Sequence, residues 1–132
     1  MGPNKAELRR IFVRASGSVV EHATLPFDSA FDAVIECEAG TALHGSGGRY
    51  AVRIDVIDLS AMRSVVESAI VASGSLGDAK WPSPAHQFVF GIAAPGPTSE
   101  GHIWKAFASL KVGVRTPDIS FAESTIFVIS SP

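Results

Sequence analysis

Apolar and polar residues alternate along residues 101–114, which read GHIWKAFASLKVGV. With a period of two, one face of this segment is wholly apolar and begins at Trp104, whereas Lys105 and Lys111 fall on the other face. A helical period would place Val112 on the polar side. The pattern therefore favours a strand, and it predicts that Trp104 packs in the core over the small Ala106 and Ala108.

Other parts of the chain repeat this alternation. The predicted strands cover residues 11–15, 31–39, 50–56, 88–92 and 124–130. Clusters of glycine and proline separate these runs, as turns require, and proline is absent from the alternating runs themselves. The sequence thus predicts an all-β fold, an antiparallel β-sandwich of seven to eight strands. The order of the runs resembles an immunoglobulin-like sandwich, although the Cys-Trp-Cys framework of antibody domains is absent.

Two segments also fit a helix. Residues 60–72 place Met62, Val65 and Val66 on a helical stripe, with Ser60 as a cap. Residues 29–39 follow Asp28, a second candidate cap, and end at a glycine. An α+β fold with helices near 29–39 and 60–72 is therefore the alternative.

Length and composition limit the class of protein. A chain of 132 residues with 46% hydrophobic and 18% charged residues fits a single domain, residues 1–132, with one core. The net charge of −2 argues against a nucleic-acid partner, and no apolar run is long enough to span a membrane. The lone Cys37 excludes an intrachain disulfide. These features, together with abundant alanine and arginine, predict a bacterial cytoplasmic protein.

The sequence contains no catalytic motif. No serine lies in a G-x-S-x-G frame, and no histidine pair has the spacing of a metal site, so we expect neither a metal nor a cofactor. Four residues are weak candidates for ligand or partner binding: Trp81, Tyr50, His86 and His102. Trp81 lies in a proline-flanked loop, where it can anchor a partner or plug the end of a sandwich.

We therefore expect a protein that is not an enzyme. The favoured hypothesis is a non-catalytic β-sandwich interaction module that contacts another protein or forms a homo-oligomer. One alternative is a domain that binds a small molecule or a carbohydrate through Trp81 and Tyr50. Another is an enzyme whose site combines His86, His102 and a carboxylate from distant parts of the chain.

Overall fold

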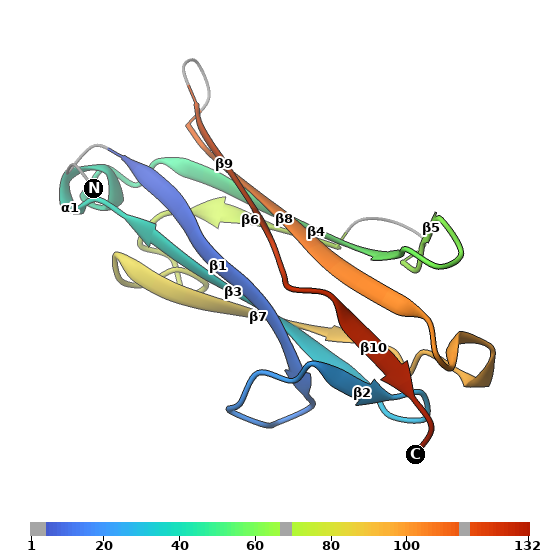
Figure 1. Cartoon of the computed structure of the whole chain (residues 1–132). Helices are drawn as coiled ribbons and strands as arrows, with labels where there is room; N and C mark the ends of the chain where they lie inside the picture. Colours follow the sequence, from blue (N-terminus) through green and yellow to red (C-terminus); the bar gives the residue numbers. More distant parts are fainter. Residues whose placement is uncertain (1–4, 67–69, 114–116) are drawn as a thin grey trace.

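Two β-sheets pack face to face in the computed structural model, which describes residues 5–66, 70–113 and 117–132 (Figure 1). Its elements are β1 (Ala6–Ala15), β2 (Thr24–Pro26), β3 (Phe31–Ala39), α1 (Thr41–Gly45), β4 (Arg49–Asp58), β5 (Arg63–Ser64), β6 (Ile70–Ser75), β7 (Ala85–Ile92), the 3-10 turn η1 (Pro97–Ser99), β8 (Ile103–Val112), β9 (Asp118–Glu123) and β10 (Phe127–Ser130). Within the described residues, the smaller sheet has three strands in the order β1-β3-β7 and the larger sheet has seven. The predicted all-β sandwich is confirmed.

The larger sheet is organised around β4 and β8. These two long strands pair antiparallel from Tyr50 opposite Val112 to Asp58 opposite Trp104. β6 and the short β5 pair with β4, whereas β9 and β10 pair with β8. β2 joins the edge as a short parallel neighbour of β10. In the smaller sheet β3 is central, and a bulge between Leu8 and Arg10 interrupts the register of β1.

Alternate side chains of β4 and β8 point into the core. Trp104 is only 3% exposed, as predicted, and it packs against Phe31 and Phe127 with ring centroids 6.2 and 6.3 Å apart. Ala106 and Ala108 follow it on the same buried face. Burial of each large apolar side chain contributes about 1.5–3 kcal/mol, so this interface supplies a large part of the folding free energy.

The α+β alternative is wrong for residues 29–39, because Phe31–Ala39 is the central strand β3. Residues 60–66 hold turns and the short β5, and 70–75 form β6, while 67–69 lie outside the described residues. Met62 has a positive φ of 56°, which closes a tight turn where a helix would need a negative φ. The strand count also differs: the described chain has ten strands, of which β2 and β5 have three and two residues.

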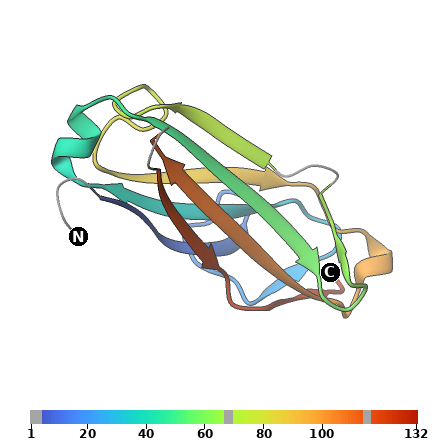
Figure 2. The same cartoon turned by 90° about the horizontal axis from the view of Figure 1, so that it is seen from above.

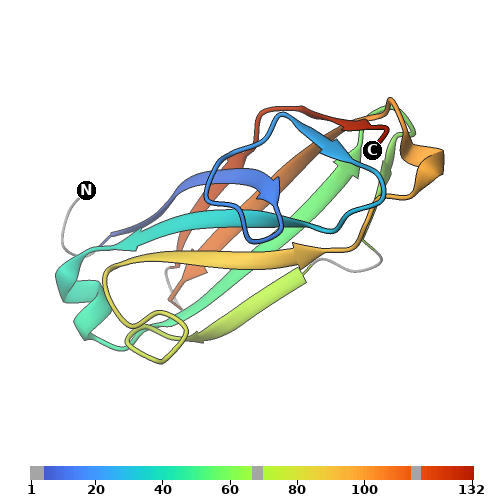
Figure 3. The same cartoon turned by 90° about the horizontal axis from the view of Figure 1, so that it is seen from below.

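The two ends of the sandwich carry different connections. Helix α1 and the loop between β6 and β7 lie at one end, whereas η1 and the turn before β5 lie at the other (Figures 2 and 3). On one side of the molecule, β6 of the larger sheet and β7 of the smaller sheet run next to each other (Figures 2 and 3). His86, near the start of β7, and His102, just before β8, therefore lie toward opposite ends.

The atoms around Gly74 in β6 leave no room for a side chain at this position. A Cβ atom at this position would collide with Asp78 Oδ2 and lie 3.1 Å from the Tyr50 hydroxyl oxygen. We predict that Gly74→Ala lowers the free energy of unfolding by about 1–3 kcal/mol, the usual cost of overpacking. Gly91→Ala in β7 is the matched control, because a Cβ there meets no atom within 4 Å. Urea denaturation of both variants checks this, and equal midpoints would contradict the proposed collision.

Candidate functional site

Three of the four sequence-predicted site residues meet at the α1 end of the sandwich. Tyr50 and Trp81 pack edge to face with ring centroids 5.1 Å apart, and both contact Phe88. His86 lies against the same phenylalanine at 4.8 Å. Trp81 is 0% and Tyr50 3% exposed, so Trp81 is a structural plug and neither ring offers a face to a ligand.

Asp78 holds the loop that carries Trp81. Its carboxylate accepts hydrogen bonds from the backbone N–H groups of Ser75, Lys80 and Trp81 at 2.9–3.1 Å, and from the Tyr50 hydroxyl at 3.3 Å. Burial opposes ionisation of Asp78, but these donors outweigh it and lower the pKa of the carboxyl. Burial, followed by the nearby Asp78 charge, raises the pKa of Tyr50 to about 12. The cluster is therefore a polar anchor for a loop.

The fourth predicted residue, His102, lies at the opposite end and pairs with a buried acid. Its Nδ1 is 2.7 Å from Asp58 Oδ2, and the Asp58 side chain is 0% exposed. The other carboxylate oxygen accepts the Ala61 N–H at 3.0 Å. Burial opposes ionisation of Asp58, yet the His102 and Ala61 hydrogen bonds outweigh it and lower its pKa. The Trp104 indole N–H adds a smaller contribution, although it makes no hydrogen bond of regular geometry.

A histidine oriented by a buried carboxylate resembles two members of a hydrolytic triad. The third member is missing among the described residues, where no serine, threonine or cysteine hydrogen bonds to His102 Nε2. Cys37 is buried on the other sheet, and its burial raises the pKa of the thiol to about 12, which disfavours the nucleophilic thiolate. The Asp58–His102 pair instead ties the end of β4 to the start of β8.

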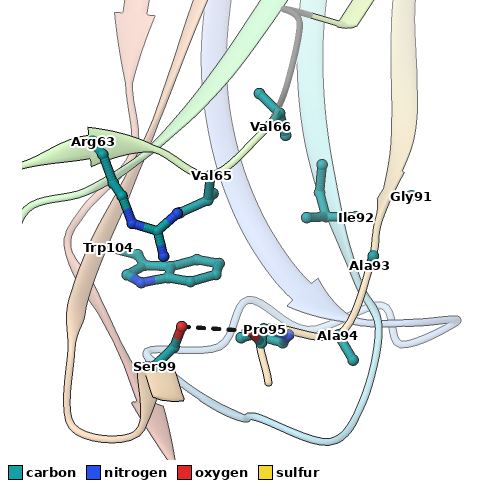
Figure 4. A pocket seen from close by; sticks show the side chains of 10 residues that line it. All are labelled: Arg63, Val65, Val66, Gly91, Ile92, Ala93, Ala94, Pro95, Ser99 and Trp104. Carbon is teal, nitrogen blue, oxygen red and sulfur yellow. Dashed lines mark hydrogen bonds between the residues drawn. The ribbon is translucent and has the colours of Figure 1, made fainter. Parts of the chain in front are cut away.

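A cleft of about 330 Å³ opens at the same end, between the β5 turn, the end of β7 and the loop before η1. Figure 4 shows the Arg63 guanidinium beside the Trp104 indole, with Ile92 and Pro95 on the opposite wall. The Ser99 hydroxyl donates to the Pro95 carbonyl at 3.4 Å (Figure 4). Neither Asp58 nor His102 lines the cleft. It can hold a small apolar group beside one cation, but it contains no acid–base pair.

The outer face of the larger sheet carries a feature that the sequence analysis missed. Phe121 and Ile119 project from β9 with 76% and 57% of their surface exposed. Phe107 of β8 and Phe121 line one shallow depression of about 310 Å³. We call Phe107, Ile119 and Phe121 the β8–β9 patch. Large apolar side chains that stay exposed together on a regular strand commonly mark a contact surface.

Cations border the β8–β9 patch. In the register of the sheet, Lys111 faces Ile119, and Arg53 and Phe121 both face Ser109. The acids on this face already have partners: Glu123 pairs with Lys105 at 2.9 Å, and Asp55 accepts the Ser64 hydroxyl at 2.6 Å. No carboxylate of the described residues lies within 4 Å of the Arg53 or Lys111 side-chain nitrogens. The face is thus apolar in the middle, with Arg53 and Lys111 beside Ile119 and Phe121, and with Asp55 and Glu123 beside Phe107.

Within residues 5–66, 70–113 and 117–132, no three histidine, cysteine, aspartate or glutamate side chains gather as a metal-binding group. No helix in the same ranges has the length and apolar character needed to cross a membrane.

We predict that acidification destabilises the fold through His86. Burial, partly offset by the Asp78 charge, lowers the pKa of His86 below its ordinary 6.5. The unfolded chain therefore binds this proton more readily, and stability falls as the pH drops below about 6.5 toward the folded-state pKa. Thermal unfolding at pH 7.5 and 5.0 is the measurement. His86→Gln should show a smaller decrease in Tm than the wild type, and an equal decrease would refute the prediction.

We predict that His102 stabilises the fold through its hydrogen bond to the charged carboxylate of Asp58. His102→Ala leaves the buried carboxylate one hydrogen bond short and should cost about 1–3 kcal/mol of folding free energy. In an Asp58→Asn background the same change should cost less, because a neutral amide is easier to bury. A double-mutant cycle by urea denaturation measures the difference. The same cost in both backgrounds would show that His102 contributes only by packing.

Comparisons with known proteins identify the fold alone. No protein-family model matches the chain, and no curated protein sequence matches it. A solved structure named "putative beta-galactosidase" from Bacteroides fragilis aligns with a TM-score of 0.53 and 7% identity over 89% of this chain; the chain spans only 17% of that protein. Spo0M, a sporulation control protein of Bacillus subtilis, aligns with a TM-score of 0.47 and 10% identity, over 97% of this chain and 50% of that protein. At such identities the first alignment supports a shared β-sandwich fold and carries no function across.

Proposed function

We propose that this chain is a non-catalytic interaction module that binds a protein partner through the β8–β9 patch. The observation that carries the proposal is the exposure of Phe121, 76%, beside the exposed Ile119 on a well-formed strand. Burying such side chains against a partner gains about 25 cal/mol for each Å² of apolar surface removed from water.

The charge around the β8–β9 patch indicates the kind of partner. Arg53 and Lys111 favour a surface with acidic groups around an apolar centre. The net charge of −2 for the whole chain supports a protein partner over nucleic acid, whose phosphates require many cations.

Two observations make the other hypotheses weaker. The rings of Trp81 and Tyr50 are buried, so the carbohydrate hypothesis loses the stacking platform on which it rested. His86 and His102 lie at opposite ends of the sandwich, so they do not form one enzyme site.

The strand order β1-β3-β7 in one sheet and β8-β4-β6 in the other supports an immunoglobulin-like arrangement. A bacterial cytoplasmic setting stays a prediction.

The test is photo-crosslinking in the organism that makes the protein. A photoreactive phenylalanine analogue at position 121 should give a discrete adduct with another protein. The same analogue at Met62, which is 83% exposed on the turn between β4 and β5 and is not part of the patch, is the matched control and should not give that adduct. Identical adducts at both positions, or none at 121, would contradict the proposal.

With the partner in hand, we predict that Phe121→Ser weakens binding by about 2 kcal/mol, or roughly thirtyfold, as for a central aromatic contact. Because Phe121 is exposed, its replacement should leave the melting temperature nearly unchanged. Titration calorimetry and thermal unfolding measure the two effects. Unchanged affinity would exclude Phe121 from the interface.

A further inference from the structure

β7 is an edge strand, and the direction in which each residue points its backbone N–H and C=O groups can be assigned. The Ala39 N–H donates to the Pro84 carbonyl at 2.9 Å, and this pair continues the register between β3 and β7. Hydrogen-bonded and non-hydrogen-bonded pairs alternate along an antiparallel ladder. Phe88 and Phe90 therefore bond to β3, whereas Gln87, Val89 and Gly91 direct their N–H and C=O groups to the outer edge.

The outer edge of β7 lacks hydrogen-bond partners. The Ser83 hydroxyl donates to the Ala85 carbonyl at 3.2 Å, which closes the beginning of the strand. No hydrogen bond within the described part of the chain reaches the backbone N–H or C=O of Gln87, Val89 or Gly91. The middle and end of β7 thus present a row of donors and acceptors.

Two other edge strands, β1 and β6, carry side-chain caps within the described residues. Along β1, the N–H groups of Ala6 and Leu8 donate to Asp118 and Ser120 of β9 at 3.2 and 3.0 Å, and the strand carries a bulge. Along β6, Asp78 accepts the Ser75 N–H, and the Lys80 ammonium donates to the Ser73 carbonyl at 3.3 Å. Such side-chain caps and bulges prevent an edge from pairing with another strand.

β7 carries none of these protections. Its sequence, AHQFVFGI, has no proline, lysine, arginine or carboxylate over eight residues. Val89 is 48% exposed on its outer face, and Phe90 is only partly buried at the edge of the core. An uncharged, regular edge strand of this length is a template for an added strand.

We propose that β7 pairs antiparallel with β7 of a second copy of this chain, about a two-fold axis at Val89. The two smaller sheets then form one continuous sheet across the dimer. This register places Val89 opposite Val89 of the second copy and Gln87 opposite Gly91, and each such pair exchanges two backbone hydrogen bonds. It also sets Phe88 opposite Phe90, so the partly buried phenylalanine gains an aromatic cross-strand neighbour.

The strand suits its own copy because it is self-complementary. β7 has no lysine, arginine or carboxylate that could face a like charge in the second copy. Of the neighbouring carboxylates on β3, Asp32 beside Gly91 is paired with Arg14 at 3.3 Å, and Glu36 beside Gln87 accepts a hydrogen bond from the Gln87 amide at 3.5 Å. Gly91 has open space where a Cβ would lie, which leaves room for the Gln87 side chain of the second copy. A two-fold axis makes each of these contacts twice, so one favourable strand register suffices for a closed dimer.

Sedimentation equilibrium over a wide concentration range tests the proposal on the whole chain. The wild type should approach twice the 13.8 kDa chain mass. Val89→Lys places two ammonium groups face to face at the axis and should raise the dimer dissociation constant at least tenfold. Val128→Lys is the matched control, because Val128 is 37% exposed but lies on β10, between β2 and β8. It should dimerise like the wild type.

Gln87→Lys is a second edge variant, which keeps the test valid if Val89→Lys lowers the melting temperature. A wild type that stays monomeric at every concentration overturns the proposal, as does a dimer that neither edge variant weakens. If the β7 amides were protected from hydrogen exchange only when a different protein was present, the edge would belong to that protein. This result would also overturn the dimer proposal. The dimer does not depend on the β8–β9 patch, so Phe121→Ser should leave it intact.

Discussion

The antiparallel pairing of β4 with β8 is the interaction on which the rest of the sandwich depends. It gives the larger sheet two long central strands, and their inner faces supply much of the core that covers β3. A buried or partly buried carboxylate fixes each end of this pairing. Asp58, the last residue of β4, binds His102 just before β8, and Tyr50, near the start of β4, binds Asp78 in the loop that holds Trp81. These polar contacts set the strand register and the loop positions, while apolar burial provides most of the stability.

The unequal size of the two sheets explains where the molecule can meet others. A three-stranded sheet cannot cover every edge and face of a seven-stranded one, so part of the surface must be protected by side chains or remain available. β9 illustrates both outcomes: Asp118 and Ser120 cap the edge of β1, and the intervening Ile119 and Phe121 are left in water. β7 at the opposite edge has no such cap in the described chain. The two proposed contacts thus use different elements of one architecture.

Sequence periodicity was sufficient to predict the strands that bury one face. Residues 31–39 and 50–56 alternate, with Val34 and Ala51 as apolar exceptions on the polar face, and they form β3 and most of β4. β6 was missed because residues 60–72 also fit a helical stripe, and only the pairing with β4 decides between the two periods. β9 was also missed, although Ile119 and Phe121 alternate with polar residues, because only the pairing with β8 identifies this short run as a strand and shows that its apolar side chains face outward.

The site residues were harder to predict than the fold. The sequence hypotheses grouped Trp81 with Tyr50 and His86 with His102, whereas the fold brings Tyr50, Trp81 and His86 to a single cluster around Phe88. The partner of His102 could not be identified, because Asp58 is 44 residues away and only the β4–β8 register places it there. The available sign of this partner in the sequence was that Asp58 is a carboxylate at the end of an alternating apolar strand. Its burial depends on contacts between distant segments, which the spacing of residues in one chain does not reveal.

Amide hydrogen exchange along β7, resolved by residue, tests most directly the central claim that this edge is built for a second strand. In dilute protein the Phe88 and Phe90 amides should be protected by β3, while those of Gln87 and Val89 exchange rapidly. At high concentration all four should be protected. Protection of Gln87 and Val89 in the dilute monomer would show that the chain already covers this edge. Rapid exchange at every concentration would show that nothing pairs with it.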